Sequence, residues 1–305
     1  MADITASMVK ELRELTGAGM MDCKKALNET NGNMDEAVEF LRKSGAAKAE
    51  KKASRIAAEG ICRVALDGNK KAAVVEVNSE TDFVAKNETF QTFVEAVAKQ
   101  ALASSAADVE AMMDEKFVDD AAKTVKEALV EKTATIGEKL SIRRFEKVEG
   151  DCVVSYIHGG GRIGVLVVGN GAGDSDEVKE ALTNVAMQVA ALSPKFISQK
   201  DVDPEFLAKE KEIILAQIEN DPKEAAKPDK VKEGMVMGRI NKEMKEFCLL
   251  DQVYVKAEDG KQSVANYLAS VSKDLVVAKF VRFEVGEGME KKNEDFAAEV
   301  AAQLG

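Results

Sequence analysis

The sequence predicts an α+β protein in which a small helical unit precedes two related units, each built around an antiparallel sheet. Three observations support this fold class. Apolar residues at helical spacing recur within residues 1–46. Two β-rich runs about a glycine turn occur at residues 61–77 and again at 153–168. Each unit then closes on a similar strand, RFEKVEG at 144–150 and RFEVGEG at 282–288, which predicts two copies of one hairpin, helix and strand arrangement.

The first region is expected to form three short helices. Gly17 can supply the left-handed end of the first helix, and Asn31-Gly32 suits the end of the second, because these residues accept positive φ. Asn33 is a suitable N-cap for the third helix. The apolar positions are Met8, Val9, Leu12 and Leu15 in the first helix, Met20, Met21 and Leu27 in the second, and Met34, Val38 and Leu41 in the third.

Met20 and Met21 are adjacent and follow a glycine turn, where at most one of them can point fully into so small a core. Adaptable apolar side chains at a turn suit a docking surface, and filling gaps in the core is an equally good interpretation. The basic stretch from Lys48 to Arg55 alternates with Ala and Glu, which is typical of a solvated linker or helix. We place the end of the helical unit there and assign it residues 1–55.

The second sheet unit, residues 151–288, is longer than the first, residues 56–150, and the excess falls at about 200–248. This segment is predicted to be an antiparallel coiled coil that projects from the second unit. Its outgoing helix begins at Asp203-Pro204, where proline is tolerated. Gly234 and Gly238 would let the two helices approach closely. The apolar faces are Leu207, Ile214 and Ile218 in the outgoing helix and Val236, Ile240, Met244 and Phe247 in the return helix.

Phe83 lies in the heptapeptide TDFVAKN, residues 81–87, directly after the apolar run from Ala72 to Val77. A large aromatic residue where a buried strand leaves its sheet is either part of the core or a protruding wedge. Polar, turn-forming residues follow it, and the next amphipathic helix gathers its apolar stripe only from Phe90 onward. Spacing alone favours the core, because most phenylalanines are buried.

Composition excludes several classes of function. A net charge of -11 and a pI near 5.0 argue against nucleic-acid binding, since phosphate contacts need clustered Lys and Arg. The N-terminus lacks a signal peptide pattern, and no apolar run approaches the roughly 20 residues of a membrane span, so we expect a cytoplasmic protein. Cys23, Cys62, Cys152 and Cys248 form no CxxC pair, which favours reduced structural thiols over a zinc site.

No residue pattern indicates catalysis, a bound cofactor or a metal. The single histidine, His158, cannot complete a histidine-rich metal site. The glycine-rich segments at 158–164 and 169–176 lack the P-loop pattern, so turns are the better interpretation. The acidic residues are abundant, but no pair of them is singled out by apolar surroundings that would tune one member as a general acid. The sequence therefore predicts a protein that is not an enzyme.

Four motifs in order give the chain a resemblance to the elongation factor Ts family, the bacterial nucleotide-exchange factors of the GTPase elongation factor Tu. They are ELRELTGAGMMDCKKAL at 11–27, TDFVAKN at 81–87, RIGVLV at 162–167 and RFEVGEG at 282–288. The resemblance covers essentially the whole chain. It implies a ubiquitin-associated-like domain at residues 1–55, two related core subdomains, a coiled-coil insertion and a short C-terminal helical module at 289–305.

The same resemblance implies which residues act. Phe83 would be a wedge that inserts into the GTP-binding domain of elongation factor Tu near its Mg²⁺, with Asp82 as a polar companion within Thr81–Val84. Arg13, Met20 and Met21 match family positions that dock on a helix of that domain. Gln188 stands where the family often has histidine, and the resemblance implies a contact with elongation factor Tu there. QVY at 252–254 replaces the QPF that relatives commonly show.

The resemblance therefore predicts a guanine-nucleotide exchange factor that acts indirectly on bound GDP and Mg²⁺. Two alternatives come from other classes of function. A passive adaptor would hold a partner through the N-terminal helices without accelerating GDP release. A nucleotide-using enzyme built on the glycine-rich turns would itself bind a nucleotide, and the missing P-loop lysine argues against it.

Overall fold

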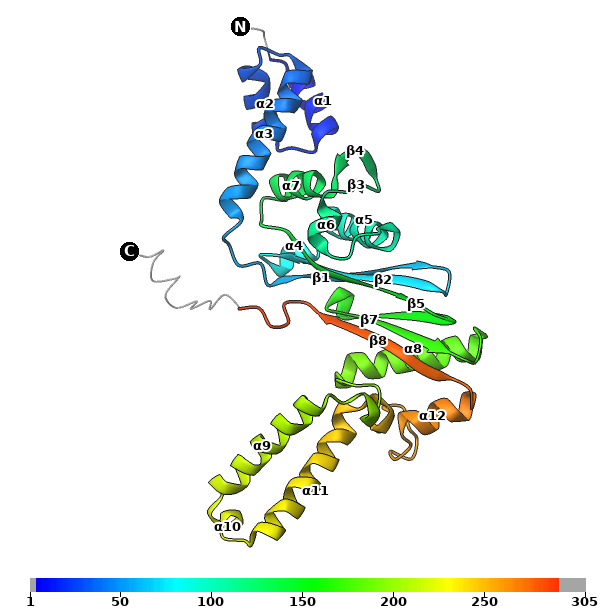
Figure 1. Ribbon diagram of the computed structural model, residues 1–305. Helices are drawn as coiled ribbons and strands as arrows, with labels where there is room; N and C mark the ends of the chain where they lie inside the picture. The colour runs from blue at the N-terminus through cyan, green and yellow to red at the C-terminus, as the bar shows by residue number, and fades with distance from the viewer. Residues whose placement is uncertain (1–3, 291–305) are drawn as a thin grey trace.

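The computed structural model describes residues 4–290 and arranges them in three parts along one long axis (Figure 1). A helical unit lies at one end, two stacked sheets with their covering helices form the middle, and a helical hairpin projects at the other end. This confirms the mixed α+β class. The predicted C-terminal helical module, residues 289–305, lies outside the described residues except for its first two positions.

The N-terminal unit consists of α1 (Ala6–Thr16), α2 (Met20–Glu29) and α3 (Met34–Lys52). Two predicted helix ends are confirmed: Gly17 caps α1 at φ 67°, and the Asn33 side chain at the start of α3 accepts a hydrogen bond from the Glu36 amide at 3.2 Å. Helix α3 continues through most of the basic stretch, so that stretch is mainly helix. The buried core of this unit consists of Val9, Leu12, Cys23, Ala26, Leu27 and Ala37.

The first sheet unit has an antiparallel sheet in the order β1-β2-β5. Helix α5 covers its outer face, where Phe90, Phe93 and Val97 pack into the first core. The elements are β1 (Glu59–Asp67), β2 (Lys71–Ser79), α4 (Asp82–Ala85), α5 (Glu88–Ala103), α6 (Val109–Met113), β3 (Lys116–Phe117), β4 (Asp120–Thr124), α7 (Val125–Ile136) and β5 (Ser141–Glu149).

The second unit repeats this topology, since its antiparallel sheet has the order β6-β7-β8 and helix α8 covers its outer face. The predicted repeat is therefore confirmed. The last strand corrects the predicted range 282–288, because β8 ends at Glu284 and residues 285–288 form the turn that follows it. The elements are β6 (Cys152–His158), the 3-10 turn Gly159–Gly161, β7 (Ile163–Asn170), α8 (Asp176–Leu192), α12 (Val264–Val271) and β8 (Val276–Glu284).

The two sheets stack on each other through their inner faces, and the helices lie outside (Figure 1). Gly164 allows this close approach: a Cβ there would lie 2.9 Å from the Cβ of Cys62 and 3.1 Å from a methyl of Val74. The core between the sheets consists of Cys62, Ala72, Val74, Val148, Val153, Leu166, Val168, Val281, Phe283 and Val285.

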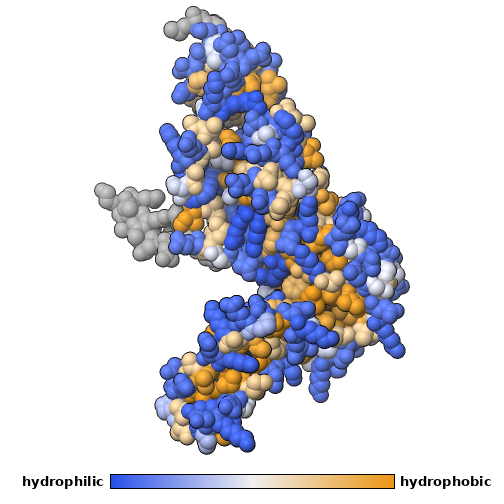
Figure 2. Space-filling model, viewed as in Figure 1, coloured by the Kyte–Doolittle hydropathy of each residue, from blue (hydrophilic) through white to orange (hydrophobic). Residues whose placement is uncertain are grey.

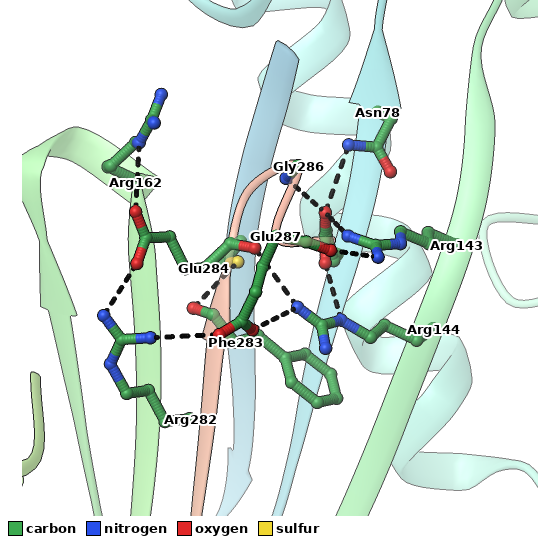
Figure 3. A network of polar contacts seen from close by, with 11 residues as sticks. Asn78, Arg143, Arg144, Arg162, Arg282, Phe283, Glu284, Gly286 and Glu287 are labelled. Atoms are coloured by element: carbon green, nitrogen blue, oxygen red, sulfur yellow. Dashed lines mark hydrogen bonds and ion pairs between the residues drawn. The ribbon is translucent and has the colours of Figure 1, made fainter. Parts of the chain in front are cut away.

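A buried carboxylate joins the two units, and Figure 3 shows the network of polar contacts around Arg143, Arg144 and Gly286. Glu76 of β2 is completely buried and accepts hydrogen bonds from Arg143 at 2.9 Å and Arg144 at 2.6 Å, both on β5. It also accepts from the amide of Gly286, at 2.9 Å, in the turn after β8. Burial raises the pKa of Glu76, but the bonds from Gly286 and the two arginines outweigh it, so the pKa lies below its usual value.

The hairpin consists of α9 (Pro204–Asn220), α10 (Pro222–Ala225) and α11 (Asp229–Phe247). The predicted apolar faces meet, because Ile214, Ile218, Ile240 and Met244 are buried together. The predicted role of Gly234 and Gly238 is wrong: within the described chain, a Cβ at either position would meet nothing within 4 Å. Both glycines lie on the exposed side of α11, and the apolar side chains set the distance between the helices.

Two further predictions concern the solvent and redox setting. Between residues 4 and 290, no helix is long and apolar enough to cross a membrane. The four cysteines are all buried and free, which agrees with structural thiols. Burial raises the pKa of the Cys62 thiol to about 12, so it stays protonated and donates a weak hydrogen bond to the Phe283 carbonyl at 3.6 Å.

Candidate functional site

The segment after β2 folds into α4, a single helical turn at the end of the first sheet, near the point where the chain arrives from α3 (Figure 1). Thr81 is the N-cap, and its side chain accepts from the Val84 amide at 3.4 Å. Within this turn, Ala85 is buried and Val84 packs against the first core. Phe83 points the other way and is 80% exposed.

The prediction from spacing that Phe83 belongs to the core is therefore wrong. Its position on the turn explains why: Val84 and Ala85 already occupy the inward side of α4, and a single turn has no second inward direction. A phenylalanine that leaves most of its ring in water costs free energy unless a partner covers it. The exposed ring is therefore a candidate contact residue, in agreement with the protruding alternative.

Two acidic side chains fasten the start of α4 to the segment that follows α7. Glu138 accepts hydrogen bonds from the Thr81 amide at 3.0 Å and from the Thr81 hydroxyl at 2.7 Å. Glu80 accepts in return from the Lys139 amide at 2.6 Å and from the Arg55 guanidinium at 3.2 Å. These are hydrogen bonds to charged acceptors, which are stronger than neutral ones. We call the three bonds that join Glu138 to Thr81 and Glu80 to Lys139 the clasp.

Asp82, next to Phe83, is exposed and ionised. The Lys86 ammonium donates to its carboxylate at 2.6 Å, and this hydrogen bond holds the pKa of Asp82 below its usual value. The pair is solvent-exposed on one face of α4, so it contributes little to stability. Asp82 is therefore a charge that a partner can reach directly.

A second exposed surface lies at the turn between α1 and α2. Met20 and Met21 are 58% and 77% exposed, so the interpretation that they fill gaps in the core is wrong. Arg13 is exposed in the last turn of α1. Leu15 of the same turn is 65% exposed, so the prediction that it belongs to the apolar stripe of the first helix is wrong. We call Arg13, Leu15, Met20 and Met21 the N-terminal surface.

Gln188 of α8 does not lie on the surface. It is completely buried, and its amide donates to the Gln252 side chain at 3.1 Å and to the Val253 carbonyl at 3.0 Å. Its oxygen accepts from the Val255 amide at 2.8 Å. This corrects the expected direct contact, since the side chain offers no surface to a partner. Its hydrogen bonds instead hold residues 252–255, where Val253 and Val255 are exposed.

The glycine-rich segments are turns, as predicted. Gly159–Gly161 joins β6 to β7, and a Cβ at Gly161 would lie 2.6 Å from the Arg63 guanidinium. A Cβ at Gly171 would lie 2.4 Å from the Asp274 carbonyl. These glycines serve close packing within the protein.

Further apolar surface lies along the hairpin. Figure 2 shows an apolar band there between charged rims. The helices α9 and α11 also flank a groove of about 600 Å³ that includes Leu215, Val236 and Met237.

Sequence reasoning did not identify Glu80 and Glu138 as part of the site. Both are acidic residues in turns and are separated by 57 residues or more from the groups they bind across the clasp. The only signal in the sequence was their position, since Glu80 directly precedes the TDFV motif and Glu138 follows the helix-ending Gly137.

Comparison with known proteins gives a consistent family. The family model described as elongation factor TS matches residues 80–287. Elongation factor Ts of Clostridioides difficile strain 630 is 51% identical over 308 residues, covering 100% of both chains. Those of Clostridium novyi strain NT and Clostridium perfringens strain ATCC 13124 are 50% and 52% identical, with 99% of each chain covered. The chain therefore belongs to the elongation factor Ts family and is a factor of translation elongation.

Proposed function

We propose that this protein is the guanine-nucleotide exchange factor of elongation factor Tu and acts in the cytoplasm. The observation that carries the proposal is Phe83, an aromatic ring held 80% exposed on a short helix whose start is fastened by hydrogen bonds. Such a ring is suited to enter a pocket of a partner. Its motif, Thr81 to Val84, also falls within the part of the chain that matches the family model.

The proposed mechanism uses the way in which a GTPase holds GDP. The nucleotide is bound largely through its phosphates and a bridging Mg²⁺, so displacing the elements that hold the ion removes charge compensation from the diphosphate. Entry of Phe83 near that ion would stabilise the displaced arrangement by filling an apolar pocket, with the Asp82 carboxylate beside it. GDP then leaves faster, and no covalent bond changes in this chain.

Thermodynamic linkage sets the direction of exchange. If the factor weakens GDP binding by a given ratio, GDP weakens binding of the factor by the same ratio. The protein therefore speeds equilibration between nucleotides without choosing the product, and loading with GTP follows from its excess over GDP in the cell. The N-terminal surface would supply affinity by docking on the same GTPase domain, with Met20 and Met21 as adaptable apolar contacts.

The test is the release of fluorescent GDP from purified elongation factor Tu, chased with excess unlabelled nucleotide, with and without this chain at catalytic concentration. We expect faster release with many turnovers per molecule of factor. Binding without acceleration would contradict the exchange mechanism and support the passive adaptor. Nucleotide bound by the isolated chain would instead support the nucleotide-using enzyme.

A further inference from the structure

Helix α4 is too short to hold Phe83 in place by its own hydrogen bonds. It spans only Asp82–Ala85, and helices of this length are unstable alone because nucleation costs more than one turn returns. Its internal ion pair, Asp82 with Lys86, is exposed and weak. The position of the Phe83 ring must therefore be set by groups outside α4.

At the C-terminal end of α4, the support is the first core, against which Val84 packs, and one side-chain bond. Ala85 lies in the first core, and the Gln91 amide donates to its carbonyl at 3.1 Å. At the N-terminal end, Glu138 accepts both the amide and the hydroxyl of Thr81, and the Ser79 hydroxyl donates to the Thr81 carbonyl at 3.0 Å. Glu138 thus fixes the residue that caps α4, two positions before Phe83.

Glu138 is itself held by helix α7. This helix ends at Ile136, and Gly137 caps it in the left-handed conformation with its amide donating to the Thr133 carbonyl at 3.0 Å. Glu138 follows directly. The Lys139 amide donates to Glu80 at the same junction. Each of the two segments, 80–81 and 138–139, therefore contributes one carboxylate that accepts hydrogen bonds from the other segment.

The last turn of α7 also contacts the N-terminal unit. Gly45 of α3 lies so near α7 that a Cβ there would be 3.3 Å from the Cβ of Ala134. Gly17 lies beside Thr135, at 3.9 Å by the same measure. Within the unit, Lys48 of α3 pairs with Asp22 at 2.7 Å, the residue after Met21. Helix α7 therefore contacts both the unit that carries the N-terminal surface and the clasp that holds Phe83.

We infer that Glu138 is a positioning residue for exchange: through Thr81 it sets the position of Phe83 relative to the N-terminal surface, with α7 as the rigid connection. Both surfaces must meet one partner at the same time, so their separation decides whether the ring reaches its pocket once the N-terminal surface has docked. This inference rests on the proposed function. It predicts that loss of the clasp lowers the rate of exchange and leaves docking intact.

The experiment compares the wild-type chain with Glu138→Ala, Glu138→Gln and Glu110→Ala in GDP release from elongation factor Tu at increasing factor concentration. Glu110 is an exposed glutamate of α6 and serves as the matched control. For Glu138→Ala we expect a maximal rate lowered by about tenfold, since two bonds to a charged acceptor are lost. The concentration for half-maximal rate should change little. Glu138→Gln, which keeps one acceptor oxygen, should lie between, and Glu110→Ala should match the wild type.

Two further readouts separate positioning from a general loss of structure. Glu138→Ala added to Phe83→Ala should slow exchange no more than Phe83→Ala alone, because both act through one ring. Hydrogen exchange of the free chain should show faster exchange of the Thr81–Val84 amides in Glu138→Ala, with unchanged protection in β1 and β2. If Glu138→Ala does not fold, Glu138→Gln, which keeps the cap bond from the Val84 amide to Thr81 and one acceptor oxygen, should lower the maximal rate in the same direction.

An unchanged maximal rate in Glu138→Ala, alongside a slow Phe83→Ala, would overturn the inference while leaving the exchange function standing. Unchanged amide protection over Thr81–Val84 would also overturn it. If the wild-type chain itself fails to accelerate release, the proposed function fails, and the hydrogen exchange result still decides whether Glu138 holds α4.

Discussion

At the scale of single residues, Phe83 allows function to be separated from stability. Its ring is 80% exposed and contributes little to the core, so Phe83→Ala should leave the melting temperature of the free chain unchanged within about 2 °C. The ring should matter only when the partner covers it. A well-packed aromatic anchor is worth about 2 kcal/mol, which corresponds to a fall of about 30-fold in the maximal rate of GDP release.

Leu66→Ala is the matched control for Phe83→Ala, since Leu66 is also a large exposed apolar residue, at the end of β1. It should exchange nucleotide at the wild-type rate. An equal rate for Phe83→Ala and the wild-type chain would show that the ring is not the wedge. A large drop in the melting temperature of Phe83→Ala would show instead that the ring supports the fold.

The methionines of the N-terminal surface should affect affinity and not the maximal rate. Met20→Ala combined with Met21→Ala removes two exposed side chains, so the fold should be retained. Binding to nucleotide-free elongation factor Tu, measured by calorimetry, should weaken by about tenfold, as expected when two contact residues outside the wedge are truncated. Val118→Ala, another exposed apolar position, should bind normally. Normal binding by the double variant would remove these residues from the interface.

Residue types alone could not tell which side chains of the site are exposed. Phe83 is exposed because Val84 and Ala85 occupy the inward side of a one-turn helix, a fact that depends on where that turn docks. Gln188 is buried because residues 252–255 fold over it and use its whole amide. In both cases the residues that determine exposure become neighbours only when the chain folds. The family resemblance supplied the protruding position of Phe83, and spacing did not.

At the scale of elements, local signals predicted helix ends well. Gly17 and Asn33 act as caps in the structure because capping depends on residues within one turn. Helix faces were also predictable where the apolar spacing was strict, as in the α9 and α11 hairpin. The face of the helix on which a single glycine lies could not be predicted, since a residue with no side chain does not contribute to the apolar periodicity. Gly234 and Gly238 accordingly face outward.

The outward glycines of α11 lead to a stability prediction. An exposed glycine inside a helix costs about 1 kcal/mol relative to alanine, because it loses more backbone freedom on folding. Gly234→Ala and Gly238→Ala should therefore each stabilise the hairpin by about that amount. Hydrogen exchange of the α11 amides, followed by mass spectrometry, should slow in both variants.

Gly164→Ala provides the contrast to these variants, because its Cβ would lie 2.9 Å from Cys62 between the stacked sheets. It should destabilise the chain. If Gly234→Ala or Gly238→Ala speeds exchange in α11, the two helices are closer at these glycines than the structure shows, and the original expectation of a glycine contact is restored.

At the scale of the whole molecule, the repeat was visible in the sequence, but the way in which the copies pack was not. The matched hairpins and closing strands predicted two sheets, and both sheets have the same order. Their stacking depends on pairs such as Gly164 with Cys62, which lie far apart in the chain. The role of Glu76 could not be predicted for the same reason. Its charge lies within the apolar run of β2, and its partners Arg143, Arg144 and Gly286 are distant in the sequence.

Glu76 makes the junction of the two units sensitive to acid. Its folded-state pKa lies below the unfolded value of about 4.3, so its contribution to stability is fully present above that pH. The contribution is lost as the pH falls through the folded-state pKa, where the carboxylate takes a proton and the arginines lose their acceptor. Glu76→Gln removes the charge at every pH. At pH 7 it should cost about 2 kcal/mol, since the arginines left behind are partly exposed and screened.

The measurement is urea unfolding of the wild-type chain and Glu76→Gln, followed by far-ultraviolet circular dichroism between pH 7 and pH 3. The difference in free energy of unfolding should be constant down to about pH 4.3 and then shrink as Glu76 is protonated in the wild type. Glu149→Gln is the matched control, because Glu149 lies on β5 in an exposed pair with Lys71 and should cost little at any pH. A Glu76→Gln difference that stays constant to pH 3 would mean that the shape of the side chain, and not its charge, holds the turn after β8 against the first sheet.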